Sequence, residues 1–241
     1  IFSKLMNRRN SFIEDAFVLG VFGLGSLCVM FALSRAGLLC YALCLVIIFF
    51  LSFLSEFSLK KIVLTVLIAF FGIAVLAFAM KTLIERFVRA PPQSAQTRVD
   101  LAKAAGNMAN AGPLGIGLNN FGLKVNPPYH YADHIDRRKH FYKEGIVETI
   151  YLLIAAETGW FNLFIFLCWL WGFYGRNLLN VMRYRGKQVQ YVPIALVGSL
   201  TGVYLESVLE WVLKQTSNFY QLMILFGIIS AMMLKWREEQ R

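Results

Sequence analysis

Hydrophobic positions in this chain form long uninterrupted runs, which short polar segments and one long polar segment separate. A helix that crosses the hydrocarbon core of a bilayer needs about 20 apolar residues. The pattern predicts six membrane-spanning helices: Ala16–Leu33, Ala36–Leu54, Ile62–Met80, Ile146–Tyr174, Tyr191–Leu213 and Phe219–Leu234. The fourth run is too long for one plain span, and Glu148 and Glu157 indicate that its first turns lie in the interface or in a protein-lined cavity.

The basic residues of the short loops predict an orientation for these spans. Cytoplasmic loops of membrane proteins are enriched in Lys and Arg. If the spans alternate, four basic clusters fall on one side, which we therefore predict to be cytoplasmic: Lys4, Arg8 and Arg9; Lys60 and Lys61; Arg176, Arg183, Arg185 and Lys187; Lys235, Arg237 and Arg241. The opposite short loops hold only Arg35 and Lys214.

One long segment, residues 81–145, lies on the opposite, extracytoplasmic side in this topology. Long loops in compact proteins are usually functional or disordered. Thr97 and Asp100 have the spacing of a capping box, which predicts a helix from Arg98 to about Ala109. Residues 113–122 are rich in glycine and predict a tight turn. The chain thus divides into a three-span part at 1–80, the loop at 81–145 and a second three-span part at 146–241.

Composition supports a polytopic, all-α membrane protein and excludes several other classes. The chain is 58% hydrophobic and 16% charged, whereas soluble domains are about 45–50% apolar and about 25% charged. The net charge of +10 follows from the basic loops, which disfavours a nucleic-acid partner. The chain begins at Ile1 rather than Met, so we expect a fragment that lacks its N-terminal part. The cysteines lie in apolar runs without a CxxC pair, which disfavours disulfides and metal sites: Cys28, Cys40, Cys44 and Cys168.

Two arginines could bind an anion. Arg35 follows Ser34 between the first two spans, where it is either a boundary anchor or a clamp for phosphate oxygens. Arg98 would lie in the first turn of the loop helix, where free N–H groups also favour anions; the alternative is an ordinary solvated helix face. Lys103 could extend this basic surface. Gly115-x-Gly117 lacks the strand and helix of a dinucleotide site and indicates a backbone turn.

Several carboxylates lie near the predicted membrane boundary. Glu144 and Glu148 would share a helical face with Tyr151, and desolvation together with a like-charged neighbour should raise the pKa of Glu148. Such a group can act as a general base, although acids at a helix N-terminus also suit the helix dipole. Intramembrane carboxylates are functional or paired, and both roles remain open for three more residues: Glu157, Glu206 (perhaps with Arg35) and Glu210, which is four residues before Lys214. The spacings of His130, His134 and His140 match no closed metal-ligand set.

Three stretches of the chain together resemble the O-antigen ligase and polymerase superfamily. Ser34-Arg35-Ala-Gly37 resembles its SR(G/A) step at the start of a span. Arg98, a short helix and Pro113-Leu-Gly-Ile-Gly-Leu-Asn-Asn-Phe121 are similar to its R…A…PLxGxGxxxF stretch. Ile150-Tyr151-Leu-Leu-Ile-Ala-Ala-Glu157-Thr-Gly159 resembles its YLxxxAETG helix. The similarity covers roughly residues 10–235.

The resemblance implies a GT-C-like membrane glycosyltransferase of the bacterial inner membrane that works at the periplasmic face without a metal or other cofactor. Its donor would be a glycan on undecaprenyl pyrophosphate, and its acceptor lipid A core, a polysaccharide or a protein hydroxyl. Arg35 and Arg98 match the family's pyrophosphate-binding arginines. The family has about twelve spans, so six spans would form a C-terminal half.

One position departs from the family pattern. Glu148-Thr149 stands where the family has His-Asn, so the base has been exchanged, the chemistry has changed or the protein is inactive. Our leading hypothesis is an inverting transfer in which Arg35 and Arg98 stabilise the departing pyrophosphate and Glu148 deprotonates the acceptor. The alternative is a polysaccharide exporter or membrane scaffold without chemistry. The expected substrate-binding residues are Lys103, Asn119, Asn120, Tyr131, Glu144 and Tyr151.

Overall fold

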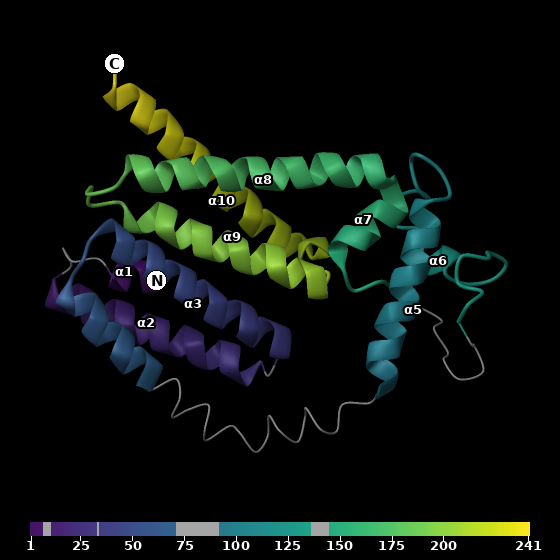
Figure 1. Ribbon diagram of the computed structural model, residues 1–241, viewed down its shortest axis with the longest axis horizontal. Coiled ribbons are helices and arrows are strands. Elements are labelled where there is room, and N and C mark those ends of the chain that lie inside the picture. Colours follow the sequence, from purple (N-terminus) through teal and green to yellow (C-terminus); the bar gives the residue numbers. More distant parts are fainter. Residues whose placement is uncertain (7–10, 33, 71–91, 136–144) are drawn as a thin grey trace. The chain divides into compact units, whose positions relative to one another are not determined.

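The computed structural model describes residues 1–6, 11–32, 34–70, 92–135 and 145–241, and every regular element in these ranges is a helix (Figure 1). The chain divides into two compact units. The first contains α1, α2, α3, a helix over 59–70, the last part of α8 and most of α9 and α10. The second contains α5, α6, α7, the first part of α8 and η1. The elements are α1 (Phe2–Leu5), α2 (Phe12–Phe31), α3 (Arg35–Ser55), α5 (Pro92–Ala109), α6 (Phe121–Lys124), α7 (Ile150–Thr158), α8 (Trp160–Arg183), α9 (Tyr191–Leu209), the 3-10 helix η1 (Val212–Lys214) and α10 (Thr216–Glu239).

Four described helices are long and apolar enough to cross a membrane: Phe12–Phe31, Ala36–Ser55, Tyr191–Leu209 and Thr216–Glu239. They coincide with the first, second, fifth and sixth predicted spans, and the all-α membrane class is confirmed. The fifth is shorter than predicted, because α9 ends at Leu209 and η1 follows after a short break. The third predicted span is described only as the helix over 59–70, and its remainder lies outside the described residues. The count of six spans therefore stays a prediction.

The fourth apolar run is divided by a backbone break. Gly159 has φ +89° and separates α7 from α8, a conformation that residues with a side chain rarely adopt. The expectation that this run is more than one plain span is therefore confirmed. Helix α8 begins at Trp160 and continues to Arg183, beyond the predicted end.

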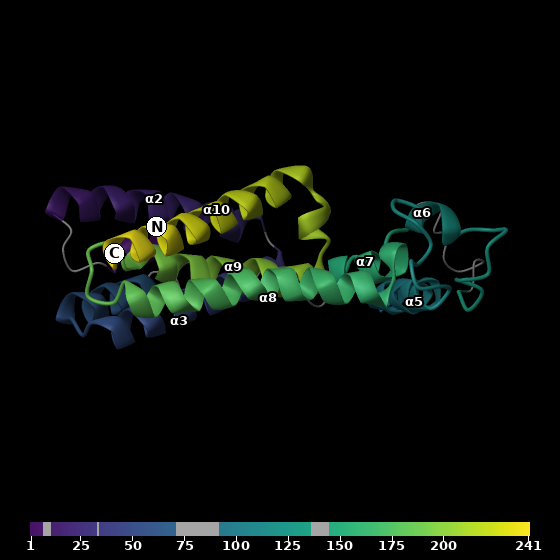
Figure 2. The ribbon, with the colours of Figure 1, turned by 90° about the horizontal axis from the view of Figure 1, so that it is seen from above.

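In the first unit, small residues allow α9 to lie close against α3, and the two helices run side by side in Figures 1 and 2. The Cys44 thiol donates to the Gly198 carbonyl at 3.1 Å. A Cβ atom at Gly202 would lie 2.5 Å from the Cys44 sulfur. Gly198 and Gly202 thus form a small-xxx-small surface, which permits close backbone approach between membrane helices.

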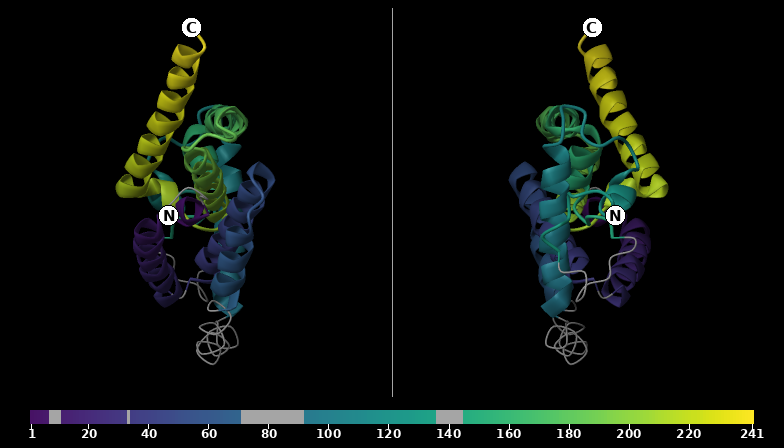
Figure 3. Two further views of the ribbon diagram at one scale, coloured as in Figure 1. Left: turned by 90° about the vertical axis from the view of Figure 1, so that its left-hand side faces the viewer. Right: turned by 90° about the vertical axis from the view of Figure 1, so that its right-hand side faces the viewer.

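Basic residues of the predicted cytoplasmic side bind the C-terminal end of α3, a helix of the first unit that Figure 3 draws nearly end-on with the rest of the ribbon. The ammonium group of Lys61, which is 2% exposed, donates to the carbonyls of Ser52 (2.6 Å) and Glu56 (2.8 Å). Arg185 donates to the Leu54 carbonyl at 3.0 Å. Cations stabilise the free carbonyls and the negative dipole end of a helix C-terminus, so these residues also have a structural role.

In the second unit, α5 packs against α7. The contact face of α5 is made of small or flexible buried side chains, including Leu101, Ala105 and Met108, and α7 contributes Ala155 and Ala156. The predicted helix start at Arg98 is wrong, because α5 begins at Pro92. Proline is favoured in the first turn of a helix, where its missing N–H group is not needed. Thr97 and Asp100 are consequently interior residues and do not form a capping box.

Candidate functional site

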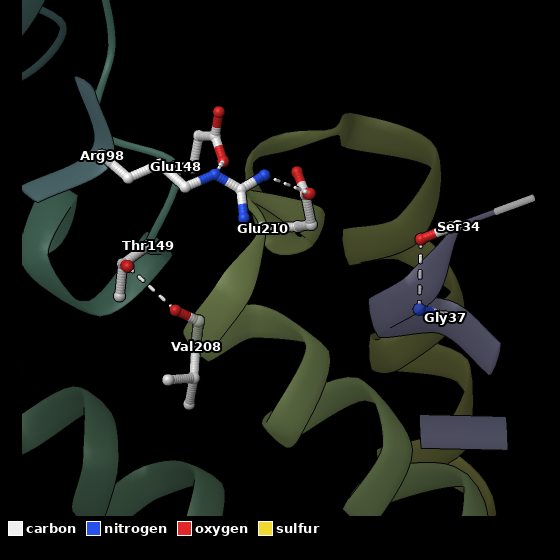
Figure 4. A network of polar contacts seen from close by, with 7 residues as sticks. All are labelled: Ser34, Gly37, Arg98, Glu148, Thr149, Val208 and Glu210. Carbon is white, nitrogen blue, oxygen red and sulfur yellow. Dashed lines mark hydrogen bonds and ion pairs between the residues drawn. The ribbon is translucent and has the colours of Figure 1, made fainter. Parts of the chain in front are cut away.

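Arg98 lies between two carboxylates in the second unit (Figure 4). Its Nε forms an ion pair with Oε2 of Glu148, and its Nη2 lies 3.3 Å from Oε1 of Glu210. Glu148 comes just before α7 and Glu210 just after α9. We call Arg98, Glu148 and Glu210 the charged triad.

Three segments hold the charged triad together. Helix α5 carries Arg98 and packs on α7. Thr149, the residue before α7, donates its hydroxyl to the Val208 carbonyl at 2.8 Å (Figure 4). This bond fixes the segment that carries Glu148 against the last turn of α9, from which Glu210 emerges. The geometry therefore depends on backbone contacts as well as on the attraction between charges.

The electrostatics of the charged triad favour a proton on Glu148 more than on an ordinary glutamate. The three side chains of the charged triad are 35–47% exposed. The Oε2 atom of Glu148 is nevertheless shielded from solvent, and its contact is the ion pair with Arg98 rather than a hydrogen bond. Glu148 lies before α7 and outside the four candidate membrane helices. Desolvation raises its pKa, the Arg98 charge lowers it and Glu210 raises it, with a net upward shift. The predicted rise is confirmed, and the like-charged neighbour found is Glu210; Glu144 lies outside the described residues.

Two expectations about the arginines change. Arg98 lies more than one turn inside α5, so the free N–H groups of that helix end do not assist it. Arg35 instead is the first residue of α3, and the N-cap Ser34 accepts a hydrogen bond from the Gly37 N–H at 3.1 Å (Figure 4). The helix end that could favour an anion is thus the one beside Arg35, in the first unit.

The carboxylates of α9 do not form one helical row. Because α9 ends at Leu209, Glu210 and Lys214 are not on a common helix face. Lys214 lies over the Trp211 ring, 5.8 Å from its centre. In the first unit, a Cβ atom at Gly37 would lie 3.6 Å from Glu206 Oε1, so this carboxylate faces the first turn of α3. Pairing of Glu206 with Arg35 stays a prediction.

The proposed substrate-binding residues are scattered over the second unit. Lys103 is exposed, and its offset of five residues from Arg98 turns it by about 140° around the helix, so it does not extend the surface of Arg98. Asn119 is exposed with φ +56°. Asn120 donates to the Ile116 carbonyl at 3.2 Å, and Tyr131 accepts from Asn107 through its backbone carbonyl at 2.9 Å.

Tyr151 and the histidines have surroundings that the sequence does not reveal. Tyr151 packs against Ala109, Ala155 and Leu163. It shares no helix with Glu148, because α7 begins at Ile150. His130 contacts Asp133 at 2.9 Å on the surface, and His134 contacts the Asp100 carbonyl at 3.0 Å. His140 lies outside the described residues, and within the described ranges no three ligand side chains gather as a metal site would require.

The glycine-rich turn and the end of α7 bind one another. The N–H groups of Ile116 and Gly117 donate to the Ala156 and Glu157 carbonyls, each at 2.9 Å. The Glu157 carboxylate, 8% exposed, accepts from the Phe121 N–H at 3.3 Å. The interpretation of Gly115-x-Gly117 as turn chemistry is confirmed. Glu157 has a structural partner, which connects two of the three motifs.

Replacing Gly159 with Ala should loosen this connection. A Cβ atom there would collide with the Pro113 carbonyl, and the φ of +89° disfavours a side chain. We expect the Gly159→Ala protein to lose about 1–3 kcal/mol of unfolding free energy, measured by thermal unfolding in detergent. Gly172→Ala is the matched control, because a Cβ atom at Gly172 meets nothing within 4 Å. Equal unfolding temperatures for the two variants would contradict the close contact.

The apolar helices and the charged triad define an all-α membrane protein with a polar site outside its candidate spans. A family model described as O-antigen ligase matches residues 10–167, more than half of the chain. The chain belongs to the O-antigen ligase family. Comparisons with curated proteins and with solved structures found no match. Family and apolar helices together indicate a bacterial membrane protein of the ligase or polymerase type.

Only part of the charged triad could be predicted. Arg98 and Glu148 lie within the matched region, whereas Glu210 lies beyond it. Glu210 was considered as an intramembrane carboxylate, but its partner lies 112 residues away in the chain. No periodicity connects residues at that separation. The available signal was the excess of carboxylates near the end of an otherwise apolar run.

Proposed function

We propose that this protein transfers a glycan from undecaprenyl pyrophosphate to a hydroxyl group of lipid A core or of a polysaccharide, at the periplasmic face. The observation that carries the proposal is the charged triad, in which a cation able to bind phosphate touches a carboxylate with a raised pKa. A phosphate-binding arginine next to a general base is what glycan transfer from a lipid pyrophosphate requires. Family membership supports the ligase or polymerase type.

In the proposed reaction, the acceptor oxygen attacks the anomeric carbon of the donor sugar. The bond between that carbon and the phosphate oxygen breaks, and the pyrophosphate leaves with the electron pair. Glu148 takes the acceptor proton as the new carbon–oxygen bond forms. Arg98 stabilises the negative charge that grows on the leaving group through charge-assisted hydrogen bonds. The anomeric configuration is inverted, because a single displacement is involved.

The net charge of the charged triad determines what else the reaction needs. With both carboxylates ionised, one Arg and two Glu sum to −1. A pyrophosphate would be repelled by this sum, so a further cation is required near the donor. Arg35 is our candidate, because it begins α3 at a helix end that itself favours anions. Arg35 belongs to the first unit and Arg98 to the second, so the role of Arg35 is tested by its own alanine variant.

Donor binding would also activate the base. In the described arrangement Arg98 lowers the pKa of Glu148. If the guanidinium turns from the carboxylates to a phosphate, that stabilisation of the ionised form decreases. The pKa of Glu148 then rises further, which makes it a stronger base when the donor is in place. The ion pair thus restrains the base in the absence of donor.

Purified protein with a lipid-linked glycan and an acceptor tests the proposal, and Arg35→Ala should reduce product formation by about 100-fold or more. Product is measured by the mobility shift of the acceptor. Arg241→Ala at the chain end is the control and should retain wild-type activity. Binding of the glycan without any transfer by the wild-type protein would support the exporter or scaffold alternative instead. Wild-type product from Arg35→Ala would remove Arg35 from the mechanism.

A further inference from the structure

An uncharged stretch stands out within the otherwise basic loop. No charged side chain occurs between Lys103 and Lys124. Within it, the glycine-rich turn at residues 112–120 presents two leucines to the outside, with Leu114 72% and Leu118 76% exposed. Neighbouring apolar side chains that are exposed on one turn are candidates for a contact with a protein or a membrane.

The turn is fixed next to the first residues of α8. A Cβ atom at Gly115 would lie 2.8 Å from the Gly159 nitrogen, so the turn touches the break between α7 and α8. Trp160, the first residue of α8, donates its indole N–H to the Asn110 side chain at 2.8 Å. The turn and the start of α8 therefore form one local surface within the second unit.

That part of α8 has the pattern of a lipid-facing helix. Its exposed positions repeat at spacings of three and four, while Leu163 and Leu170 face inward. The exposed side chains are Phe161, Phe164, Ile165 and Cys168. Trp160 is 47% exposed, and tryptophan is enriched where a membrane helix meets the headgroup region. The turn that carries Leu114 and Leu118 thus adjoins the helix start that Trp160 marks as interfacial.

The backbone of the turn is suited to this environment. The N–H groups of Gly115, Ile116 and Gly117 all donate to backbone carbonyls. Irregular backbone is excluded from the hydrocarbon core because its polar groups need partners. With these donors satisfied, the turn can enter the interface, where apolar side chains reach the acyl boundary.

We propose that the turn at residues 112–120 is a membrane-seated element that inserts Leu114 and Leu118 into the headgroup–acyl boundary of the bilayer, beside the start of α8. This surface would hold the adjoining segments, α5 and α7, at a fixed height above the hydrocarbon core. The partner is the lipid bilayer itself, and no transfer activity is needed for the contact.

Spin labels placed at single cysteines test the proposal. The protein is reconstituted in phosphatidylglycerol–phosphatidylethanolamine vesicles with its four cysteines replaced by Ala or Ser, and labels are attached at Leu114→Cys and at Leu118→Cys. Labels in lipid collide more with oxygen, and labels in water more with a nickel chelate. We expect a several-fold higher oxygen-to-nickel ratio at both positions than at Asp133→Cys, an exposed site of the same unit.

Val46→Cys, an exposed position in the middle of the candidate membrane helix Ala36–Ser55, provides the reference for a site in the bilayer. Ratios at both leucine positions between those of Val46 and Asp133 support insertion. A ratio equal to that of Asp133 at either position overturns the proposal, because both leucines are required to enter. Since the labels replace exposed side chains, misfolding is not expected. The measurement does not use glycan transfer, so it is independent of the proposed function.

Discussion

Replacing Arg98 with Ala should abolish glycan transfer while the protein remains in the membrane at a normal amount. The substitution removes the cation that we assign to the leaving pyrophosphate and leaves Glu148 and Glu210 facing each other without it. Loss of one preorganised donor to a developing negative charge reduces turnover by about 100- to 1000-fold. The measurement is the rate of product formation by purified protein with a lipid-linked glycan. A second measurement is the amount of surface polysaccharide when the variant, or the wild-type protein, is expressed in a deletion strain.

Two further variants separate charge from geometry. Arg98→Lys keeps the positive charge but loses the planar fork that contacts two oxygens, so we expect activity between the wild type and Arg98→Ala. Val99→Ala, at an exposed neighbouring position of α5, is the control and should be fully active. Wild-type product from Arg98→Ala would show that the charged triad has only a structural role.

The bounds of a helix could be predicted from the sequence where one apolar run corresponds to one helix. The runs at 16–33 and 36–54 predict α2 and α3 closely, because membrane length and composition determine both. The run from Ile146 hides the break at Gly159, since apolar residues continue on both sides. That break arises from the contact of Gly159 with Pro113 in a distant loop, which no local pattern encodes.

Two residues of the candidate site could be predicted from the sequence, but their geometry could not. Arg98 and Glu148 were identified from their residue types and their place in the motifs. Their direct pairing was not predicted, and neither was Glu210 as the second partner of Arg98. The side of α5 on which Lys103 lies depends on the rotational phase of that helix. The capping-box spacing at Thr97 predicted a wrong start for α5, which begins at Pro92. Long-range pairing and helix phase are properties of the packed structure.

Replacing Glu148 with Gln should reduce transfer by about 100- to 10,000-fold, the usual contribution of a general base. Glutamine keeps the size and polarity of the side chain, but it cannot accept the acceptor proton. The Gln variant should still bind the lipid-linked donor, because Arg98 remains and one negative charge is removed from the triad. Full activity of Glu148→Gln in the same assay would exclude Glu148 as the base.

The pH dependence distinguishes a base from a residue that only positions Arg98. A base works in its ionised form, so the rate should fall as the pH decreases through the pKa of Glu148. Because that pKa is raised, the acid limb should lie above the value of about 4.3 for an ordinary glutamate. Glu148→His should move the limb toward about 6.5, the ordinary pKa of histidine, and retain part of the activity. If the acid limb of the pH–rate profile is the same in Glu148→His as in the wild type, another group is responsible for that limb. Glu148 would then serve only to hold Arg98.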